Sequence, residues 1–319
     1  MAMTTRTQKI SVLMPVKNGS KYLTKIKKDI IANIQVSDQV VIINDGSSDD
    51  TNKILDQWSD DIKNIKIITT KGVGIVESLN LGINECENNW IARFDVDDEY
   101  ANNRIDKQLT CITAETVAVF ADYDFIDDFG NGFGHMSSPL YSQATAISLF
   151  NSTRTAHSVA LINKSALLEA GGYLEEDFPA EDLSLWLRLS KLGNLLSVPD
   201  SLLKYRIRKG SVTNKKRKNA LSKKHNLLKS IGVDLPKIKY CNQNINYILN
   251  SYTNTPSETN RKILFLRDLI AANKNCAINL DFRFISAFIR EMSSYSSINE
   301  LRHLSEEQKK RSKLRKSLE

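Results

Sequence analysis

The sequence has no long hydrophobic run, and this excludes a membrane-spanning class of protein. No stretch of its 319 residues approaches the 18 consecutive apolar residues that indicate a transmembrane helix. The opening residues MAMTTRTQKI also lack the apolar core of a signal peptide. The sequence therefore predicts a protein that stays in the cytoplasm.

Cysteine is scarce and scattered. The four cysteines form no CxxC pair, and no histidine stands at the spacing of a zinc ligand. This pattern predicts buried thiols in a reducing compartment, without a disulfide, metal or redox role.

Both common phosphate-binding loops are missing. Gly72-Val73-Gly74 follows a strand-like run, but Glu77 stands where the third glycine of GxGxxG belongs. No GxxxxGK[ST] sequence occurs anywhere in the chain. A bound diphosphate therefore needs another source of positive charge.

Charge is present but unevenly distributed. The formal net charge is +7, and residues 204–229 hold eleven Lys and Arg residues and no acidic residue. A second basic cluster runs from 309 to 316, whereas acidic residues concentrate at 45–50, 95–99 and 122–128. One half of the chain is therefore suited to anions, and the other carries grouped carboxylates.

Apolar runs in the first hundred residues predict buried β-strands that alternate with helices. The strands are expected at 10–16, 39–45, 64–70 and 90–96, and the helices at 21–34, 50–58 and 74–85, the first with Ser20 as its N-cap. Successive strand–helix units with short connections predict an α/β fold: a mainly parallel, doubly wound sheet with helices on both faces.

Later elements follow a less regular order. Strands are expected at 115–122 and 157–163, a hairpin turn at 127–133 and a helix at 181–192. The segment beyond Val212 is predicted to be mainly helical. We therefore expect a catalytic domain over residues 1–212 and a helical C-terminal region over 213–319.

A doubly wound sheet binds its ligand at the carboxyl ends of its strands. Asp95 and Asp97 follow the fourth strand, and residues i and i+2 there can point to the same side. Two carboxylates can hold Mg²⁺ or Mn²⁺, which take further oxygens from substrate phosphates. An acidic loop is also typical of a solvated turn or a helix cap, but its position at the ligand-binding edge favours the metal site.

Three further acidic residues are candidates. Asp45, after the second strand, could accept a hydrogen bond from a base N–H or cap the turn before the next helix, and both roles can hold. Glu181 and Asp182 begin a predicted helix, where acidic residues suit the helix dipole. The functional alternative is a general base that removes the proton of an attacking hydroxyl. His135 and His157 are isolated in the sequence, which favours a turn or strand-end role for each.

Four segments together resemble the inverting family-2 glycosyltransferases of the GT-A fold. They are SVLMPVKNGSKYL, VVIINDGSSDDTNKIL, GIVESLNLGINECENNWIARFDVDD and GGYLEEDFPAEDLSLWLRLSKLG, which lie between residues 11 and 193, and the resemblance as a whole covers residues 9 to about 213. The pattern is similar to that of bacterial lipooligosaccharide and O-antigen transferases, some of which add β-linked N-acetylglucosamine.

The resemblance implies an enzyme that moves a hexose or N-acetylhexosamine from a UDP-sugar to a saccharide acceptor, with inversion, in the synthesis of lipopolysaccharide, O-antigen or capsule. It implies Asp182 as the base, Asp97 as the principal ligand of Mn²⁺ or Mg²⁺, and Asp95 as a second ligand beside the ribose or sugar. The implied donor site comprises Pro15, Val16, Asn18, Asp45, Asn80, Arg93, Asp95, Val96 and Arg208.

Two positions depart from the family pattern. Lys17 replaces the usual aromatic residue of PVYN, and Arg208 stands where the family's YRxH has a histidine near the diphosphate. An arginine is always charged and binds phosphate oxygens through two nitrogens. Arg208 is therefore expected to contact the donor diphosphate.

Two other functions compete with this one. A sugar nucleotidyltransferase would need a Gly- and Arg-rich loop after the first strand, and KNGSKYL is not one. A nucleic-acid binder could use the basic run, but Tyr205 is the single aromatic residue there, so no nucleic-acid partner is expected. The run instead predicts peripheral docking at the anionic inner face of the cytoplasmic membrane, where a lipid-linked acceptor would lie.

Overall fold

The computed structural model describes residues 6–136, 138, 155–208, 223 and 227. The expected boundary at 212 and, apart from 223 and 227, the helical region 213–319 lie outside these residues, as does the second basic cluster. The organisation into two regions therefore stays a prediction.

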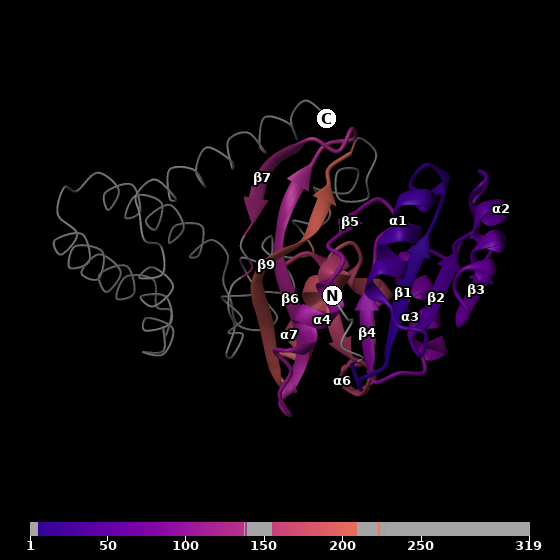
Figure 1. Cartoon of the computed structure of the whole chain (residues 1–319). Coiled ribbons are helices and arrows are strands. Elements are labelled where there is room, and N and C mark those ends of the chain that lie inside the picture. Colours follow the sequence, from indigo (N-terminus) through magenta and orange to yellow (C-terminus); the bar gives the residue numbers. More distant parts are fainter. Residues whose placement is uncertain (1–5, 137, 139–154, 209–222, 224–226, 228–319) are drawn as a thin grey trace, which may run out of the picture. The chain divides into compact units, whose positions relative to one another are not determined.

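The first four strands form one parallel half of the sheet, in the order β3-β2-β1-β4 (Figure 1). They are β1 (Ile10–Val16), β2 (Gln39–Asn44), β3 (Ile65–Thr69) and β4 (Trp90–Arg93). Every residue of β1, β2 and β4 is buried. These are the runs that the sequence marks as continuously apolar, because a strand covered on both faces has no solvent side to make polar.

The other half of the sheet is mixed, and its order continues β8-β6-β9-β5 with β7 paired to β6. Its strands are β5 (Glu99–Tyr100), β6 (Thr116–Ile126), β7 (Gly132–Met136), β8 (Leu161–Asn163) and β9 (Asn194–Arg206). β6 and β9 pair in parallel, whereas β8, β7 and β5 each pair antiparallel with a neighbour. The sheet is thus mixed rather than mainly parallel, with helices against it as expected.

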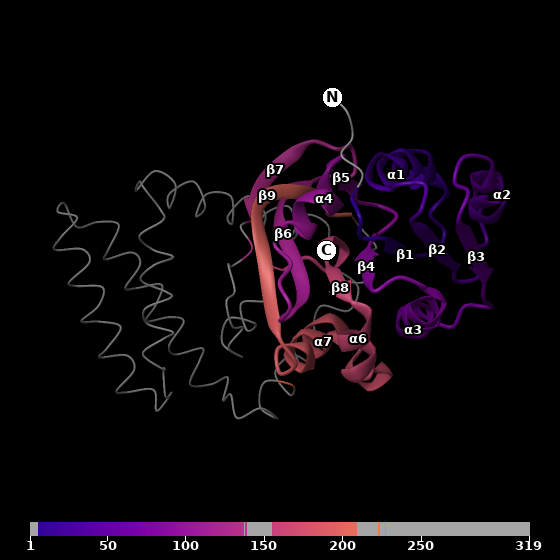
Figure 2. The same cartoon turned by 60° about the horizontal axis from the view of Figure 1, so that its bottom comes forward.

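Helices cover both faces of the sheet (Figure 2). One face carries α1 (Ser20–Asn33), α2 (Thr51–Asp56) and α4 (Arg104–Leu109), and the other carries α3 (Ile75–Glu85), α6 (Lys164–Glu169) and α7 (Glu181–Leu189). Short 3₁₀ turns lie at η1 (Gln57–Asp60), η3 (His157–Val159) and η4 (Glu175–Asp177).

The start of α1 differs from the expectation. Gly19, not Ser20, is the N-cap, and no side chain of the helix caps it. The orphan N–H groups are satisfied from the next loop instead: Thr51 Oγ1 accepts from the Gly19 N–H at 2.9 Å, and Asp49 Oδ2 from the Ser20 N–H at 3.1 Å. A Cβ on Gly19 would lie 2.6 Å from Val16 Cγ2. Only glycine therefore lets the helix start this close to β1.

Two strands are shorter than their apolar runs. β4 ends at Arg93, because the chain turns at 95–98, where the Asp98 N–H donates to the Asp95 carbonyl at 3.4 Å. The run expected as a strand from 157 instead begins with η3, and β8 starts only at Leu161. An apolar run predicts which residues are buried, but it does not predict where the strand ends and a turn begins.

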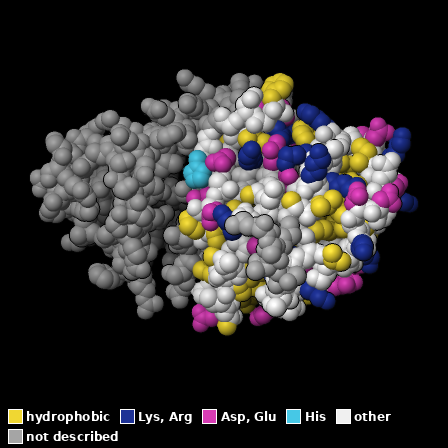
Figure 3. Space-filling view, viewed as in Figure 1, with side chains coloured by type: hydrophobic (Ala, Val, Ile, Leu, Met, Phe, Trp, Pro, Cys, Tyr) yellow, Lys and Arg dark blue, Asp and Glu magenta, His cyan; other side chains and the backbone are white. Residues whose placement is uncertain are grey.

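Acidic and basic side chains are intermixed on the face shown in Figure 3. Among the described residues, no helix has the length and hydropathy of a membrane span.

Candidate functional site

The ends of β1 and β2 form the first wall of the site. Pro15 and Val16 are the last residues of β1 and are buried, and the Asp45 N–H donates to the Val16 carbonyl at 2.8 Å. Asn18 has a positive φ of 53°. Its Oδ1 accepts from the Ser48 N–H at 2.8 Å, so the two loops that follow β1 and β2 are joined.

Asp45 is the centre of this wall. Its Oδ1 accepts from Thr70 Oγ1 at 2.7 Å and from the Val73 N–H at 2.6 Å, and its Oδ2 accepts from the Gly74 N–H at 3.1 Å. Burial raises the pKa of Asp45, but these hydrogen bonds outweigh it and lower the pKa below its ordinary value. Asp45 therefore fixes the turn before α3, whereas the structural role expected from the sequence was to cap the turn before the next helix, α2.

Lys17 lies over the same carboxylate. Its Nζ is 3.5 Å from Asp45 Oδ2, and the side chain is 53% exposed. The residue that stands where the family has an aromatic side chain is thus a partly exposed cation beside Asp45.

The turns that follow β2 and β3 also approach closely. A Cβ on Gly46 would lie 2.8 Å from the Gly72 backbone nitrogen. The turns after β2 and β3 consequently touch at this point.

Arg93 and Asp95 form the floor of the site. Arg93 ends β4 and is 2% exposed. Its NH2 donates to Asp95 Oδ1 at 2.8 Å, and its NH1 donates to the Phe94 carbonyl. Burial lowers the pKa of the Arg93 guanidinium, but Asp95 raises it further, so the net shift is upward. The buried Nε of Arg93 has no hydrogen-bond partner within the described part of the chain.

Asp97 and Arg208 meet across 111 residues of sequence. Arg208 Nε donates to Asp97 Oδ2 at 2.5 Å. Partial burial lowers the pKa of Arg208, but Asp97 reverses that effect and raises it. The structure therefore places the expected phosphate-binding arginine directly on the expected metal ligand.

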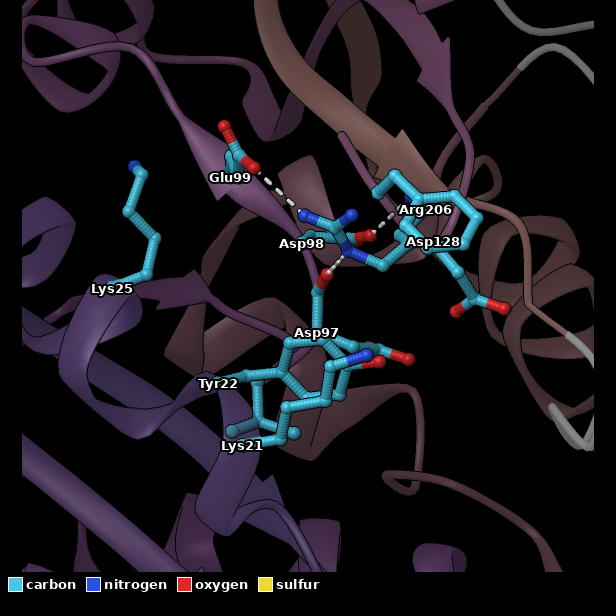
Figure 4. Close-up of a pocket in the computed structure, with 10 residues that line it drawn as sticks. Lys21, Tyr22, Lys25, Asp97, Asp98, Glu99, Asp128 and Arg206 are labelled. Atoms are coloured by element: carbon cyan, nitrogen blue, oxygen red, sulfur yellow. Dashed lines mark hydrogen bonds and ion pairs between the residues drawn. The ribbon is translucent and has the colours of Figure 1, made fainter. Parts of the chain in front are cut away.

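Asp98 and Arg206 hold the loop that carries Asp97. Asp98 is 3% exposed; its Oδ2 accepts from Ser158 Oγ at 2.6 Å and its Oδ1 from the Arg206 N–H at 2.8 Å. Arg206 in turn donates to the carbonyls of Asp97 and Asp127 and to Glu99 Oε1, each at 2.7 Å. Figure 4 shows its guanidinium between Glu99 and the Asp97–Asp98 segment.

A cavity of about 190 Å³ lies on the α1 side of this loop. Its lining is polar apart from Val96 and Phe129, and α1 contributes Lys21, Tyr22 and Lys25 (Figure 4). Asp97 lines the cavity, so the loop that carries Asp97 is accessible to a ligand from that side.

The acids at this edge fit a hard divalent cation only in part. Asp95 and Asp97 offer carboxylate oxygens, yet each also binds an arginine. No three His, Cys, Asp or Glu side chains converge on a common metal position among residues that the structure describes. Mg²⁺ and Mn²⁺ are commonly held by one or two carboxylates plus substrate phosphates and water, and the donor set fits that mode of binding.

The first turn of α7, here called the α7 wall, lies within electrostatic range of Arg93 and Asp95. Ala180 is the N-cap and makes no side-chain cap, so Glu181 and Asp182 are the acids nearest the positive end of the helix dipole. Burial and the neighbouring Asp182 raise the pKa of Glu181 to about 7. The Oε2 of Glu181 is buried without a hydrogen-bond partner among the described residues.

Tyr173 and His157, which the sequence did not single out together, lie beneath this wall. His157 Nε2 and the Tyr173 hydroxyl are 2.7 Å apart, and burial lowers the pKa of His157 well below its ordinary value. Tyr173 is buried and His157 is half-buried, and His157 also packs edge-on against Trp186 of α7. A lone histidine in an apolar run gives no sequence signal for such a contact.

Asn80, which the resemblance assigns to the donor site, contacts the backbone before α7. Its amide makes two hydrogen bonds to the Tyr173 backbone, at 2.8 and 2.9 Å. Asn80 therefore positions the segment before α7, and the structure places no other described partner on its amide. The remaining expected residue, Val96, packs beside Gly19 at the start of α1.

The family description "Glycosyl transferase family 2" matches residues 11–171. A UDP-Gal:alpha-D-GlcNAc-diphosphoundecaprenol beta-1,3-galactosyltransferase of Escherichia coli is 29% identical over 189 residues, which cover 57% of this chain and 68% of that protein. The amylovoran biosynthesis glycosyltransferase AmsE of Erwinia amylovora is 26% identical over 190 residues, with the same two coverages.

Solved structures share the fold at low sequence identity. The structure of S. aureus TarS with UDP-GlcNAc has a TM-score of 0.58 at 14% identity and covers 88% of this chain and 79% of that chain. The mannosyltransferase PcManGT of Pyrobaculum calidifontis, with GDP-Man and Mn²⁺, has a TM-score of 0.54 at 14% identity and covers 93% and 84%. Both likenesses concern the fold alone.

Glu181→Gln is expected to remove a pH-dependent loss of stability. The raised pKa means that Glu181 favours folding fully below its unfolded value of about 4.5 and loses this contribution as pH rises through about 7. The neutral amide has no such titration. In denaturant unfolding, the free energy of unfolding of the variant should therefore rise relative to that of wild type between pH 4.5 and 8, by on the order of 2 kcal/mol.

Glu176→Gln is the matched control, because Glu176 is an exposed acid five residues earlier. Its stability difference from wild type should not change over this pH range. A flat difference for Glu181→Gln as well would contradict the burial of the Glu181 carboxyl.

Proposed function

We propose that this chain, which belongs to glycosyl transferase family 2, is an inverting enzyme that moves a hexose or N-acetylhexosamine from a UDP-sugar to a saccharide acceptor. The observation that carries the proposal is the meeting of two acid pairs at one sheet edge. Asp95 and Asp97 follow β4, and Glu181 and Asp182 open α7, with Arg93 electrostatically coupled to both pairs.

Acceptor and pathway are proposed from the relatives. The Escherichia coli relative is named for a diphosphoundecaprenol-linked GlcNAc acceptor, and AmsE for amylovoran biosynthesis. We therefore propose a lipid-linked saccharide acceptor and a role in bacterial lipopolysaccharide, O-antigen or capsule synthesis. Among the fold neighbours, one structure holds UDP-GlcNAc and another GDP-Man, and in this chain the base of the donor would lie against the Asp45 wall.

The proposed chemistry gives separate roles to Asp182 and to the pair Asp95 and Asp97. Asp182 accepts the proton of an acceptor hydroxyl, whose oxygen attacks the anomeric carbon as the bond from that carbon to the diphosphate breaks. Attack from the side opposite the leaving group inverts the anomeric configuration, and UDP departs. Asp97 and Asp95 would hold Mn²⁺ or Mg²⁺, which neutralises charge on the leaving diphosphate.

Arg208 contributes a second positive charge to the proposed diphosphate site. A guanidinium has five N–H donors, so an Nε bond to Asp97 is compatible with phosphate binding through the other nitrogens. Arg208 would thus partly replace the family's metal-bound histidine. This role follows from its place beside Asp97 and from the permanence of its charge.

We also propose that the chain docks peripherally on the cytoplasmic face of the membrane through its basic run. The run at 204–229 holds eleven cations without an acid, and each cation near an anionic leaflet contributes about 1 kcal/mol. A lipid-linked acceptor makes such docking useful.

Asp182→Asn and Asp97→Ala are expected to fail in different ways. Asp182→Asn keeps the shape of the side chain but cannot take a proton, so turnover should fall by about 10²–10⁴ with UDP affinity nearly unchanged. Asp97→Ala should abolish transfer and remove the Mn²⁺-dependent part of UDP binding. Turnover is measured by UDP release, and affinity by calorimetry with Mn²⁺ or EDTA.

Asp60→Asn supplies the control, because Asp60 is an exposed acid on η1. It should behave as wild type in both assays. Full activity of Asp97→Ala in EDTA would reject the metal site, and normal turnover of Asp182→Asn would place the base elsewhere.

Arg208→Ala is expected to weaken the binding of UDP more than that of uridine. The lost guanidinium acts on the diphosphate, which uridine lacks. Calorimetry on both ligands gives the comparison, and Lys204→Ala removes an equal charge from an exposed position of β9, four residues before Arg208. Equal losses for both ligands in Arg208→Ala would refute the diphosphate contact.

Replacement of Lys215, Lys216, Arg217 and Lys218 by Gln is expected to abolish sedimentation with anionic liposomes at low salt. Wild type should sediment at low salt and be released at high salt, because the attraction is screened. Transfer to a soluble acceptor should be unaffected.

The charge-matched control replaces four exposed lysines of the catalytic domain by Gln: Lys28, Lys53, Lys63 and Lys191. It should sediment as wild type does. Equal sedimentation of the two quadruple variants would show that net charge, and not the basic run, holds the protein on the membrane.

A further inference from the structure

The cavity on the α1 side of the Asp97 loop is lined mostly by residues that have no part in the proposed function. Of the residues expected at the donor site, only Val96 and Asp97 line it, and no residue of the α7 wall does. The rest of the lining comes from α1, from the end of β9, and from the turn between β6 and β7, which contributes Asp128 and Phe129. The cavity therefore adjoins the proposed donor site but is largely distinct from it.

Hydrogen bonds fix the turn that carries Phe129, although the Phe129 side chain itself is 89% exposed. Asp127 Oδ1 accepts from the N–H groups of Phe129 and Asn131, both at 2.9 Å. The Asp127 carbonyl accepts from Arg206 at 2.7 Å, and Gly130 takes the positive φ of 87° that the turn requires. The backbone thus holds an aromatic ring at the cavity with most of the ring surface available to a ligand.

Three polar groups of the lining are available as well. The Asp127 carboxylate is used within the turn, whereas the half-buried Asp128 makes no hydrogen bond or ion pair with the described part of the chain. The Lys21 ammonium and the Tyr22 hydroxyl also lack such partners among the residues that the structure describes. Figure 4 shows Lys21 and Tyr22 on the α1 side of the cavity and Asp128 next to Arg206. The cavity therefore offers an acceptor, a donor and a hydroxyl that is both.

The charges of the lining select the class of ligand. Three further charged groups already have a partner of opposite charge: Asp97 with Arg208, Glu99 with Arg206, and Lys25 with Asp29. The two unpaired charges, on Lys21 and Asp128, are opposite in sign, so the cavity favours neither a phosphate nor a metal ion. A neutral ligand that both donates and accepts hydrogen bonds fits this lining best.

A sugar has the required chemistry and size. Its hydroxyls donate and accept hydrogen bonds at the edge of the ring, and the C–H groups of its face can pack on an aromatic side chain. The cavity volume of about 190 Å³ equals that of about six water molecules, which suits one monosaccharide unit rather than a nucleotide.

We propose that this cavity binds one neutral sugar residue, whose face packs on the Phe129 ring. Asp128, Lys21 and Tyr22 bind hydroxyls at the edge of the sugar. The inference rests on the proposed function for the source of the sugar, which is the saccharide acceptor. The bound residue is not the one that reacts, because the α7 wall, which carries the proposed base, contributes nothing to the cavity. An acceptor held at two points binds more tightly than one held at its reacting end alone.

Saturation-transfer NMR on the full chain tests the site, with the methyl β-glycosides of glucose, galactose, GlcNAc and GalNAc as probes. UDP and Mg²⁺ are present at saturation to fill the nucleotide site, and titration of the glycoside with the strongest signal gives its affinity. Phe129→Ala should weaken this affinity about tenfold, because the ring contact is lost. Phe129→Trp keeps an aromatic face and should recover most of the affinity.

Asp128→Ala tests the polar side of the cavity and should weaken the affinity by at least about tenfold, as expected for a hydrogen bond to a charged group. Two matched controls should bind the glycoside as wild type does. Val36→Ala removes an apolar side chain that is 81% exposed, and Asp60→Ala removes an exposed acid; both lie outside the cavity. Thermal melting of each variant establishes that it is folded.

Inorganic phosphate distinguishes a sugar site from an anion site. Phosphate should not compete with the glycoside, because the unpaired charges of the lining cancel. Competition that is lost in Lys21→Ala would show an anion site and overturn the inference. The inference is also wrong if no glycoside binds to wild type, or if Phe129→Ala and Asp128→Ala bind it unchanged, as they would a sugar held in the donor site.

UDP binding separates this inference from the proposed function. Calorimetry should give Phe129→Ala the UDP affinity of wild type, because Phe129 is not among the expected donor-site residues. UDP binding without glycoside binding rejects the inference and leaves the proposed function standing. Glycoside binding that depends on Phe129, in a protein that binds neither UDP nor a UDP-sugar, supports the sugar site and rejects the proposed function.

Discussion

The buried carboxylate of Asp98 determines the shape of the whole site. It joins η3 through Ser158 and the end of β9 through the Arg206 backbone, and these segments come from distant parts of the chain. Burial, together with Asp97 and Asp95, raises the pKa of Asp98 well above its ordinary value, so this position is electrostatically unfavourable for a charge. The hydrogen bonds from Ser158 and Arg206 offset part of that cost. This link acts together with the Arg206 side chain, which donates to the Asp97 carbonyl and to Glu99, to hold the loop that presents Asp97 against β9.

An arginine pairs with each of three half-buried acids at the edge. Asp95 binds Arg93, Asp97 binds Arg208, and Glu99 binds Arg206. Carboxylates packed this closely would repel one another, and the permanent cations interleaved with them reduce that repulsion. In the proposed function, the same arginines would supply the positive charge that a phosphate loop supplies elsewhere.

Local patterns in the sequence were sufficient for the parallel half of the fold and for the positions of Asp45, Asp95 and Asp97 after the ends of β2 and β4. Runs such as 10–16 and 39–45 are apolar throughout because both of their faces are covered, and the residues that follow must lie at the ligand edge. The antiparallel strands β5 and β8 span two and three residues, which is too few for a periodic signal.

Contacts between distant segments were not predictable in this way. The N-cap of α1 is Gly19 and not the expected Ser20. Thr51 and Asp49, some thirty residues further along the chain, accept hydrogen bonds from the N–H groups of Gly19 and Ser20. The pairing of Asp97 with Arg208 and of His157 with Tyr173 likewise joins residues with no common motif. For Arg208, the departure from the family pattern marked the position, but only the fold could supply its partner.

The two walls of the site differ in how completely their polar groups are satisfied. On the Asp45 wall, side-chain and backbone donors already occupy both carboxylate oxygens. On the α7 wall, Glu181 Oε2, Trp186 Nε1 and two nitrogens of Arg188 are buried without partners among the described residues. A buried polar group without a partner reduces folding stability, so the α7 wall carries a cost that the Asp45 wall does not. In the proposed function, the α7 wall is therefore the one where a substrate would complete the hydrogen bonding.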